Sequence, residues 1–378
     1  MLSNKLFLIA SLGLVALTNA QETSTFQFKD TYPEPYKVPQ PKKEWLDLIA
    51  NASIADAPLL KTDANGGLVL PENPENDPHC LWTTTQCLDK EDVYTCPTTG
   101  EWGVTFDDGP SEFSPALYDY LDKKNEKVTF YMVGGQVKQF PELLKRAYDA
   151  GHEIAMHTWS HSYMTTLTNE ELVAELKWTE QIIKEVIGVS PKYYRPPFGN
   201  IDNRVRDIGK ALGFTPVIWS VDTNDWYLPS DPTFQAQWIT NNVTEWASKN
   251  TTQGGVSLAH DLYKETVDAA LNYLPILEDA YDLKTVAQCN SQNAYKEGKG
   301  TAAGGNNTTQ PSASSSAGAS GSASESSKPS SEAGGDKKEN AEKDSATKGQ
   351  EDDESAASTL VMSATSMLLV LAAAALSA

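Results

Sequence analysis

The chain has 378 residues and a formal net charge of −21, from 30 Lys and Arg against 51 Asp and Glu. This charge argues against a nucleic-acid-binding protein, which needs a basic face to displace counterions from phosphate. A hydrophobic content of 39% with nine Trp residues is sufficient for a folded core, but both ends of the chain differ from the middle.

The first 20 residues have the features of a secretory signal peptide. Lys5 supplies a short positive region, residues 6–17 are predominantly apolar, and Ala20 ends the segment with a small side chain. This apolar run is too short to span a bilayer, which takes about 20 residues. We therefore expect a secreted protein that loses residues 1–20. A buried N-terminal helix is the alternative interpretation.

Residues 21–95 contain many prolines and no clear periodicity, so we interpret them as an extension that wraps the following domain. The four cysteines are an even number, which in an oxidising compartment predicts two disulfides with three connectivities open. No C-x-x-C spacing is present, which argues against a cysteine-based zinc site. A bond between Cys96 and Cys289 would join the ends of one domain, and one between Cys80 and Cys87 would close a short loop.

Between residues 96 and 290, short apolar runs alternate with amphipathic stretches, which predicts repeated strand–helix units. Strands are predicted over residues 102–106, 128–132, 153–156, 193–195, 215–219 and 255–258, and helices over 114–122, 141–150, 169–187, 203–212, 233–248 and within 264–278. Ser114 is expected to cap the first helix and Gly188 to end the third. The pattern predicts one α/β domain with a mainly parallel sheet, either doubly wound or closed as a barrel.

Polar residues follow several of these predicted strands. Asp107 and Asp108 come directly after the first strand, where buried carboxylates are costly unless a cation or hydrogen bonds satisfy them. His157 and His161 follow the third strand, and two histidines with a carboxylate match catalytic metal sites with open positions. Alone, each segment also suits a turn, surface histidines or a satisfied buried residue. Their joint occurrence at successive strand ends favours one site.

Five segments carry this pattern: TFDDGP (105–110), HTWSH (157–161), RPPFG (195–199), DTNDW (222–226) and LAH (258–260). In this order they resemble the five motifs of the polysaccharide deacetylases, the carbohydrate esterase 4 or NodB-homology family. The resemblance covers about residues 97–290. It implies a distorted (β/α)7 barrel with one divalent metal ion, zinc or cobalt, at its mouth. It also favours a disulfide between Cys96 and Cys289, and hence one between Cys80 and Cys87.

The resemblance also implies roles for the acidic and basic motif residues. Asp108, His157 and His161 are the expected metal ligands. Asp107 is the expected general base, which also contacts substrate, and Arg195 is expected to hold it ionised. His260 is the expected general acid, and Asp225 is expected to keep it charged and oriented.

The remaining motif residues are expected to bind the substrate. The backbone N–H of Phe198 is expected to stabilise the oxyanion, with Trp226 and Leu258 around the acetyl methyl group. Phe198 departs from the family pattern, in which Tyr is more common. Because the backbone N–H is the donor, we expect activity to survive this change.

The C-terminal part of the chain predicts a stalk and an anchor signal. Residues 301–358 contain no Val, Ile, Leu, Met, Phe, Tyr or Trp, so we expect a disordered stalk over 291–358. Residues 360–378 are apolar to the last residue, which predicts a GPI propeptide over 356–378, with a retained tail anchor as the alternative. Ser355 is the preferred attachment site and Ser345 the alternative. Glycosylation sequons agree with secretion and stand at Asn51, Asn242, Asn250, Asn306 and Asn307.

The signal, stalk and tail are similar to those of fungal GPI-anchored chitin deacetylases. We therefore expect a metal-dependent enzyme that converts chitin, an N-acetylglucosamine polymer, to chitosan and acetate at the plasma membrane or cell wall. The alternatives are deacetylation of another polysaccharide, such as acetylxylan or peptidoglycan, and an inactive structural mannoprotein of the wall. The expected partners are chitin, chitosan and, through the anchor, a membrane. We expect a monomer and no nucleic acid partner.

Overall fold

The structure is a computed structural model that describes residues 26–73, 76–249 and 253–298. Several predicted features lie outside these residues: the signal peptide, the stalk after residue 298, the attachment sites Ser355 and Ser345, and the sequons at Asn250, Asn306 and Asn307. Of the other two sequons, Asn51 is exposed and Asn242 is half-buried. Among the described residues, no helix has the length and apolar character needed to cross a membrane.

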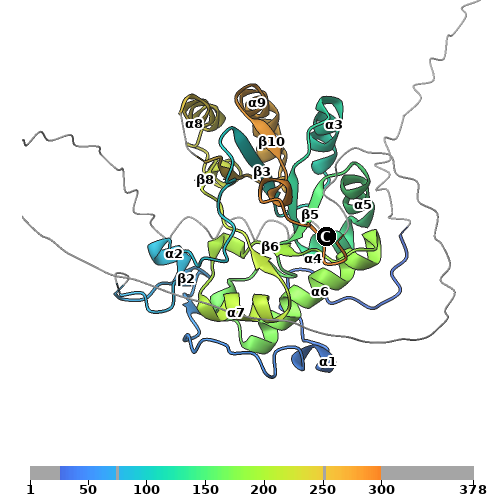
Figure 1. The fold of residues 1–378 in the computed structure, drawn as a ribbon, viewed down its shortest axis with the longest axis vertical. Coiled ribbons are helices and arrows are strands. Elements are labelled where there is room, and N and C mark those ends of the chain that lie inside the picture. The colour runs from blue at the N-terminus through green and yellow to red at the C-terminus, as the bar shows by residue number, and fades with distance from the viewer. Residues whose placement is uncertain (1–25, 74–75, 250–252, 299–378) are drawn as a thin grey trace, which may run out of the picture. The chain divides into compact units, whose positions relative to one another are not determined.

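A parallel β-sheet forms the centre of the fold (Figure 1). Its strands are β3 (Glu101–Asp107), β4 (Thr129–Met132), β5 (Glu153–Met156), β6 (Tyr193–Tyr194), β7 (Thr215–Pro216), β8 (Val221–Asp222), β9 (Val256–Leu258) and β10 (Asp282–Lys284). The strand order is β7-β6-β5-β4-β3-β9-β8, and β10 pairs with the start of β3. All these pairings are parallel, so the carboxyl ends of the strands meet at one end of the sheet.

The sheet closes through one short segment, residues 215–222. The segment pairs with β6 at its start, as β7, and with β9 at its end, as β8. The backbone N–H of Val217 donates to Tyr194 on one side, and that of Ser220 donates to Val256 on the other. Counted as one crossing strand, β7 and β8 close a ring of six strands, and β10, which pairs with β3, brings the distorted barrel to seven strands. This confirms the predicted α/β barrel.

Helices on the outside of the sheet connect its strands, and a last short helix, α10, follows the final strand (Figure 1). They are α3 (Ser114–Lys124), α4 (Gly134–Gln139), α5 (Pro141–Asp149), α6 (Asn169–Ile187), α7 (Asn203–Ala211), α8 (Ala236–Ser248), α9 (Lys264–Ala280) and α10 (Val286–Cys289), with 3₁₀ turns η1 (Met164–Thr166), η2 (Pro197–Gly199) and η3 (Asp225–Tyr227). The long α6 begins with a capping box between Thr168 and Glu171 and ends at Gly188, which has φ 81°. Both ends of α6 are therefore fixed by local hydrogen bonds, as the sequence predicted for Gly188.

The sequence predicted the longer elements but not the shortest. It did not predict β8, β10 or α4, because elements of two to six residues carry little periodicity. The strand expected over 215–219 is interrupted after Pro216, where the chain crosses from β6 to β9. Ser114 was expected to cap α3, but it lies in the first turn of this helix. Its hydroxyl instead donates to the buried carboxylate of Asp261, and Phe113 occupies the N-cap.

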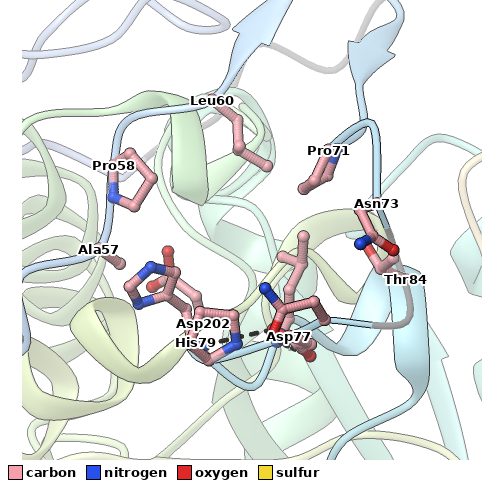
Figure 2. A pocket seen from close by; sticks show the side chains of 12 residues that line it. Ala57, Pro58, Leu60, Pro71, Asn73, Asp77, His79, Thr84 and Asp202 are labelled. Carbon is pink, nitrogen blue, oxygen red and sulfur yellow. Dashed lines mark hydrogen bonds between the residues drawn. The ribbon is translucent and has the colours of Figure 1, made fainter.

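The extension before the barrel is mostly irregular and packs on the barrel. Its short elements are α1 (Lys43–Leu46), β1 (Lys61–Thr62), β2 (Leu68–Val69) and α2 (Trp82–Thr85). Trp45 packs edge-to-face on Trp178 of α6, with ring centroids 4.9 Å apart. The disulfide between Cys80 and Cys87 closes the loop that contains α2. Figure 2 shows a pocket of about 140 Å³ between the extension and Asp202, which caps α7.

The folded unit continues past residue 290, where the sequence analysis placed the start of the stalk. Tyr295 is only 4% exposed, and it forms an antiparallel bridge with Pro191. Its hydroxyl accepts a hydrogen bond of 3.1 Å from the backbone N–H of Ile154. The disulfide between Cys96 and Cys289 joins the segment before β3 to the end of α10. The predicted boundary at residue 290 is too early by at least eight residues. The apolar pair Ala294 and Tyr295 is too short, within a polar stretch, to predict a folded segment.

Candidate active site

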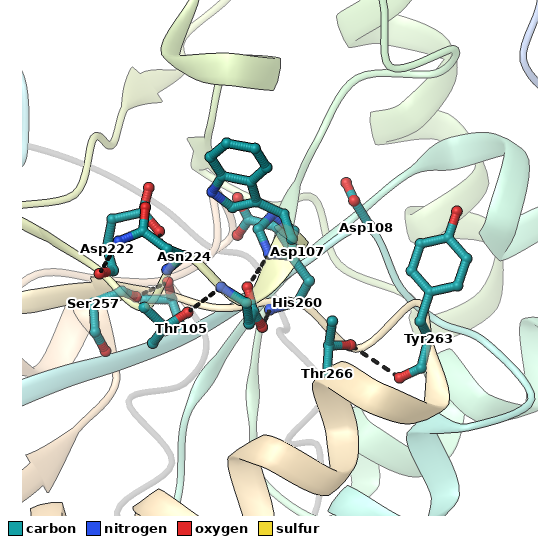
Figure 3. Close-up of polar contacts among 12 residues, drawn as sticks. Thr105, Asp107, Asp108, Asp222, Asn224, Ser257, His260, Tyr263 and Thr266 are labelled. Carbon is teal, nitrogen blue, oxygen red and sulfur yellow. Dashed lines mark hydrogen bonds and ion pairs between the residues drawn. The ribbon is translucent and has the colours of Figure 1, made fainter. Parts of the chain in front are cut away.

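Strand β3 delivers two adjacent carboxylates to the carboxyl end of the barrel. Asp107 is the last residue of β3 and is 1% exposed. Asp108 follows in the left-handed region with φ 75°, a strained conformation for a residue with a side chain. Figure 3 shows the two side chains diverging from the end of the strand. Neighbouring carboxylates therefore occupy different positions in the site.

The loop after β5 carries the two histidines. The Nδ1 atom of His157 lies 2.8 Å from the carbonyl oxygen of Arg195. Because a carbonyl only accepts hydrogen bonds, Nδ1 carries the proton and Nε2 keeps a free lone pair. Thr158 and His161 both have positive φ, of 63° and 61°, so the loop turns sharply between the two imidazoles. The ring centroids of His157 and His161 lie 4.9 Å apart.

Asp108, His157 and His161 have the arrangement of ligands around one metal ion. Their ligand atoms all lie within 4.8 Å of one another. The Oδ1 atom of Asp108 lies 3.4 Å from Nε2 of His157 and 3.1 Å from Nε2 of His161. Among the described residues, this buried oxygen has no hydrogen-bond partner.

The protonation states of these residues fit a divalent cation. Burial holds the pKa of His157 well below its usual range. Burial alone would raise the pKa of Asp108, but the nearby imidazoles, first that of His161, outweigh it and hold this pKa well below its usual range. A neutral imidazole and an ionised carboxylate are the forms that bind metal. The three residues therefore form a candidate metal site.

Asp107 is paired with a fully buried arginine. The Nη1 atom of Arg195 donates to Oδ1 of Asp107 at 2.7 Å and to Oγ1 of Thr105 at 2.6 Å. The guanidinium also lies 4.1 Å from the ring centroid of Tyr131. Burial raises the pKa of Asp107 to about 6, although the charge of Arg195 opposes this rise. The Oδ2 atom of Asp107 lies 3.7 Å from Nε2 of His157, which suits a general base beside the metal site.

His260 is paired with Asp225. His260 follows β9, and its backbone forms a parallel bridge with Asp107. Its Nδ1 atom lies 2.7 Å from Oδ1 of Asp225, and its backbone N–H donates to Oδ2 at 2.8 Å. Burial alone would lower the pKa of His260, but nearby carboxylates, first that of Asp225, raise it to about 10. His260 is therefore protonated at neutral pH and suits a general acid.

Comparisons with known proteins agree with this geometry. The sequence model of the polysaccharide deacetylase family matches residues 95–217. Chitin deacetylase 1 of Cryptococcus neoformans var. grubii is 43% identical over 241 residues, which are 59% of this chain and 51% of that protein. Chitin deacetylase 3 of Cryptococcus neoformans var. neoformans is 37% identical over 294 residues, which are 74% of this chain and 71% of that protein. The chain belongs to the polysaccharide deacetylase family.

A solved structure supports the fold of this polysaccharide deacetylase. The chitin deacetylase of Colletotrichum lindemuthianum has a TM-score of 0.50 and 23% identity, and the match covers 56% of this chain and 98% of that one. The chain spans about half the length of the first Cryptococcus relative. The family match ends before Asp225 and His260, so the assignment of these two residues depends on the geometry.

The remaining motif residues of the deacetylase lie at the same barrel end. Phe198 has φ 60°, and its ring packs edge-to-face on His161 at 4.6 Å. As the second residue of η2, Phe198 has an N–H with no partner inside that turn. Leu258 ends β9 opposite Asp222 of β8, and Trp226 lies in η3. The roles expected for Phe198, Trp226 and Leu258 stay predictions.

Sequence reasoning missed Glu175, a fully buried carboxylate of α6 that holds the histidine loop. Its Oε2 atom accepts from the backbone N–H groups of Trp159 at 2.7 Å and Ser160 at 2.8 Å. Its Oε1 atom accepts from the hydroxyl of Ser160 at 2.5 Å. Only its helical spacing, three residues after Leu172, separates Glu175 in the sequence from Glu170, which is exposed in the same helix.

Asp261 was missed as well, and it connects the two strand ends that carry the proposed base and acid. It is fully buried, and its Oδ2 atom accepts from the hydroxyl of Ser114 at 2.5 Å. Its carbonyl oxygen accepts from the hydroxyl of Ser111 at 2.6 Å. A Cβ atom at Gly109 would lie 2.3 Å from Oδ1 of Asp261, so a larger residue there would have to displace this carboxylate. In the sequence, Gly109 and Ser111 of the segment DDGPS were the residues that could have predicted this packing.

Proposed function

We propose that this deacetylase hydrolyses the N-acetyl groups of chitin to give acetate and glucosamine units. The observation that carries the proposal is that a base, Asp107, and an acid, His260, border one set of metal ligands. Each of the two has its own charged partner, Arg195 or Asp225. The names of the Cryptococcus relatives support chitin as the substrate.

The chain's own residues supply the proton transfers and the orientation. A bound divalent ion supplies Lewis-acid polarisation of the acetamide carbonyl and a lowered pKa for the attacking water. Asp107 takes a proton from that water, and Arg195 keeps the carboxylate oriented. The N–H of Phe198 donates to the oxyanion that develops on the carbonyl oxygen. As the C–N bond breaks, His260 donates its proton to the leaving amine, and Asp225 stabilises the charged imidazole.

The metal is proposed to be zinc or cobalt, because two imidazole ligands and one carboxylate suit both ions. Trp226 and Leu258 are proposed to surround the acetyl methyl group. The enzyme is proposed to be secreted as a monomer and tied by a GPI anchor to the plasma membrane or wall. Two disulfides among the described residues agree with an oxidising compartment.

Acetate release by the purified protein tests this function. Chitin oligomers, acetylxylan and peptidoglycan would be assayed in parallel, before and after a chelator, and again after zinc or cobalt is returned. We expect metal-dependent release from chitin oligomers. Release from acetylxylan or peptidoglycan alone would move the substrate to that polymer. No release from any of the three by metal-loaded protein would favour a structural wall protein.

A further inference from the structure

Residues 32–36 of the extension pack on the loop that carries the two candidate histidine ligands. The ring of Tyr32 stacks on Trp159 of this loop, with centroids 6.0 Å apart and planes 11° apart. The Nε1 atom of Trp159 donates to the carbonyl oxygen of Glu34 at 3.0 Å. A Cβ atom at Gly135, near the start of α4, would lie 3.0 Å from Pro35. The extension is therefore in direct contact with the mouth of the barrel.

The residue after Pro35, Tyr36, has an exposed side chain. The side chain is 45% exposed, and the backbone has φ 59°. A bulky residue in the left-handed region is an outlier that the surrounding structure must enforce. The ammonium of Lys138 anchors the preceding residues by donating to the carbonyl oxygens of Pro33 at 2.8 Å and Tyr32 at 3.2 Å. An exposed tyrosine is thus held in a strained conformation at the mouth.

A second tyrosine approaches from the barrel. Tyr263 is half-buried, follows His260 by three residues, and accepts a hydrogen bond of 2.9 Å from the hydroxyl of Thr266 at its carbonyl oxygen (Figure 3). Figure 3 shows Tyr263 beside Asp108, and the charge of Asp108 adds to the rise that burial causes in the pKa values of both Tyr36 and Tyr263. Three segments far apart in the sequence therefore converge beside the metal ligands.

We infer that Tyr36 and Tyr263 form a binding site for a sugar unit next to the one whose acetamide is hydrolysed. A tyrosine ring offers a rigid apolar face for the C–H face of a pyranose, and its hydroxyl exchanges hydrogen bonds with sugar hydroxyls. Neither hydroxyl has a part in the proposed proton transfers, and the hydroxyl of Tyr36 shares a hydrogen bond with the side chain of Gln139. The inference rests on the proposed function and adds to it a preference for longer chains.

This site combines the barrel with a segment outside the matched family region. Tyr36 lies in the extension, whereas the family model begins at residue 95. The extension thus contributes to substrate binding as well as to packing. Removing the extension would remove Tyr36 and leave Tyr263 as the remaining tyrosine of the proposed sugar site. Chain-length preference is therefore assigned to the contact between the extension and the barrel mouth.

Steady-state kinetics on N-acetylglucosamine oligomers of two to five units test the inference. We expect Tyr36→Ala and Tyr263→Ala each to raise KM for the pentamer about tenfold, with a smaller effect on the dimer and little change in kcat. Tyr36→Phe and Tyr263→Phe keep the rings and should retain most of the binding. Tyr94→Ala is the matched control, because Tyr94 is a 37% exposed tyrosine of the same extension. Thermal unfolding and metal content would be measured for every variant.

The outcomes separate this inference from the proposed function. If the parent protein releases acetate and the alanine variants match Tyr94→Ala, the inference is wrong and the function stands. A loss in kcat at unchanged KM, or an equal rise in KM for dimer and pentamer, also overturns it. If the metal-loaded parent releases no acetate from any oligomer, the proposed function fails, and the inference fails with it.

Discussion

Asp225 holds His260 by two hydrogen bonds at once. One carboxylate oxygen lies 2.7 Å from the ring Nδ1, and the other accepts from the backbone N–H of His260 at 2.8 Å. The same carboxylate therefore fixes both the rotation of the imidazole and the start of the loop after β9. Because it is fully buried, it also stabilises the charged imidazole more strongly than an exposed carboxylate would.

This pairing predicts a bell-shaped dependence of kcat/KM on pH. Activity requires ionised Asp107, whose pKa is about 6, so the rate rises with pH through that region. Activity also requires protonated His260, whose pKa is about 10, so the rate falls as pH rises through that value. A bound divalent cation favours the ionised carboxylate and disfavours the imidazolium, so it moves both limits to lower pH.

Asp225→Asn should move the alkaline limit of this profile toward the free imidazole value of about 6.5 and leave the acid limit in place. The amide keeps a similar shape but removes the charge that raises the pKa of His260. The measurement is a pH–rate profile of the parent and the variant. An alkaline limit that does not move would contradict the role of Asp225.

Asp107→Asn should lower acetate release by a factor of about 10² to 10⁴, because the amide cannot take a proton from water. Metal content should stay at the parent level, since Asp107 is not among the three candidate ligands. Elemental analysis and acetate release on chitin oligomers check both points. Asp119→Asn, at an exposed carboxylate, is the control. Near-normal turnover in Asp107→Asn would exclude Asp107 as the base.

His157→Ala should remove the metal and the activity together. His157 is buried, and its Nε2 atom is one of the three candidate ligand atoms, so the two remaining groups hold the ion weakly. His79→Ala removes a histidine that lines the pocket beside Asp202 and should leave metal content unchanged. Full metal occupancy in His157→Ala would refute the ligand assignment. Chelation of the parent should also lower its thermal midpoint, because the ion binds the folded state.

Glu175→Gln should weaken metal binding without removing a ligand. Glu175 accepts three hydrogen bonds from Trp159 and Ser160, which lie between the two histidines, and a glutamine offers only one acceptor oxygen. We expect about a 10- to 100-fold loss of metal affinity, measured by titration with zinc after chelation. Glu170→Gln, at an exposed residue of the same helix, is the control. Equal affinities for the two variants would show that Glu175 does not position the loop.

Removing the two disulfides should have unequal effects on stability. Cys96 and Cys289 are 193 residues apart, and Cys80 and Cys87 are only seven apart. On loop entropy alone, the long closure stabilises the folded state by about 5 kcal/mol and the short one by about 2 kcal/mol. Denaturant unfolding of the two double Cys→Ser variants measures both values. A larger loss for Cys80/Cys87 would mean that native contacts around α2, rather than chain entropy, dominate.

The sequence predicted those parts of the candidate site that depend only on which residues follow one another along the chain. Polar residues directly after short apolar strands are visible along the chain, so Asp107, His157 and His260 were found at the ends of β3, β5 and β9. Glu175 was not found, because its burial depends on how α6 packs against a loop distant from its own helical turn. Tyr36 was not found, because the extension has no periodicity and its docking depends on contacts with Trp159 and Gly135.

The last described residues determine from which end of the barrel the chain departs. Tyr295 contacts Ile154 at the start of β5 and Pro191 just before β6, whereas the histidine ligands and Arg195 follow the far ends of those two strands. The chain at residue 298 therefore leaves near the floor of the barrel. The proposed anchor, attached through this end of the chain, would hold the enzyme by its floor and leave the catalytic opening facing outward. A solid polymer would then approach the opening from the side opposite the proposed anchor.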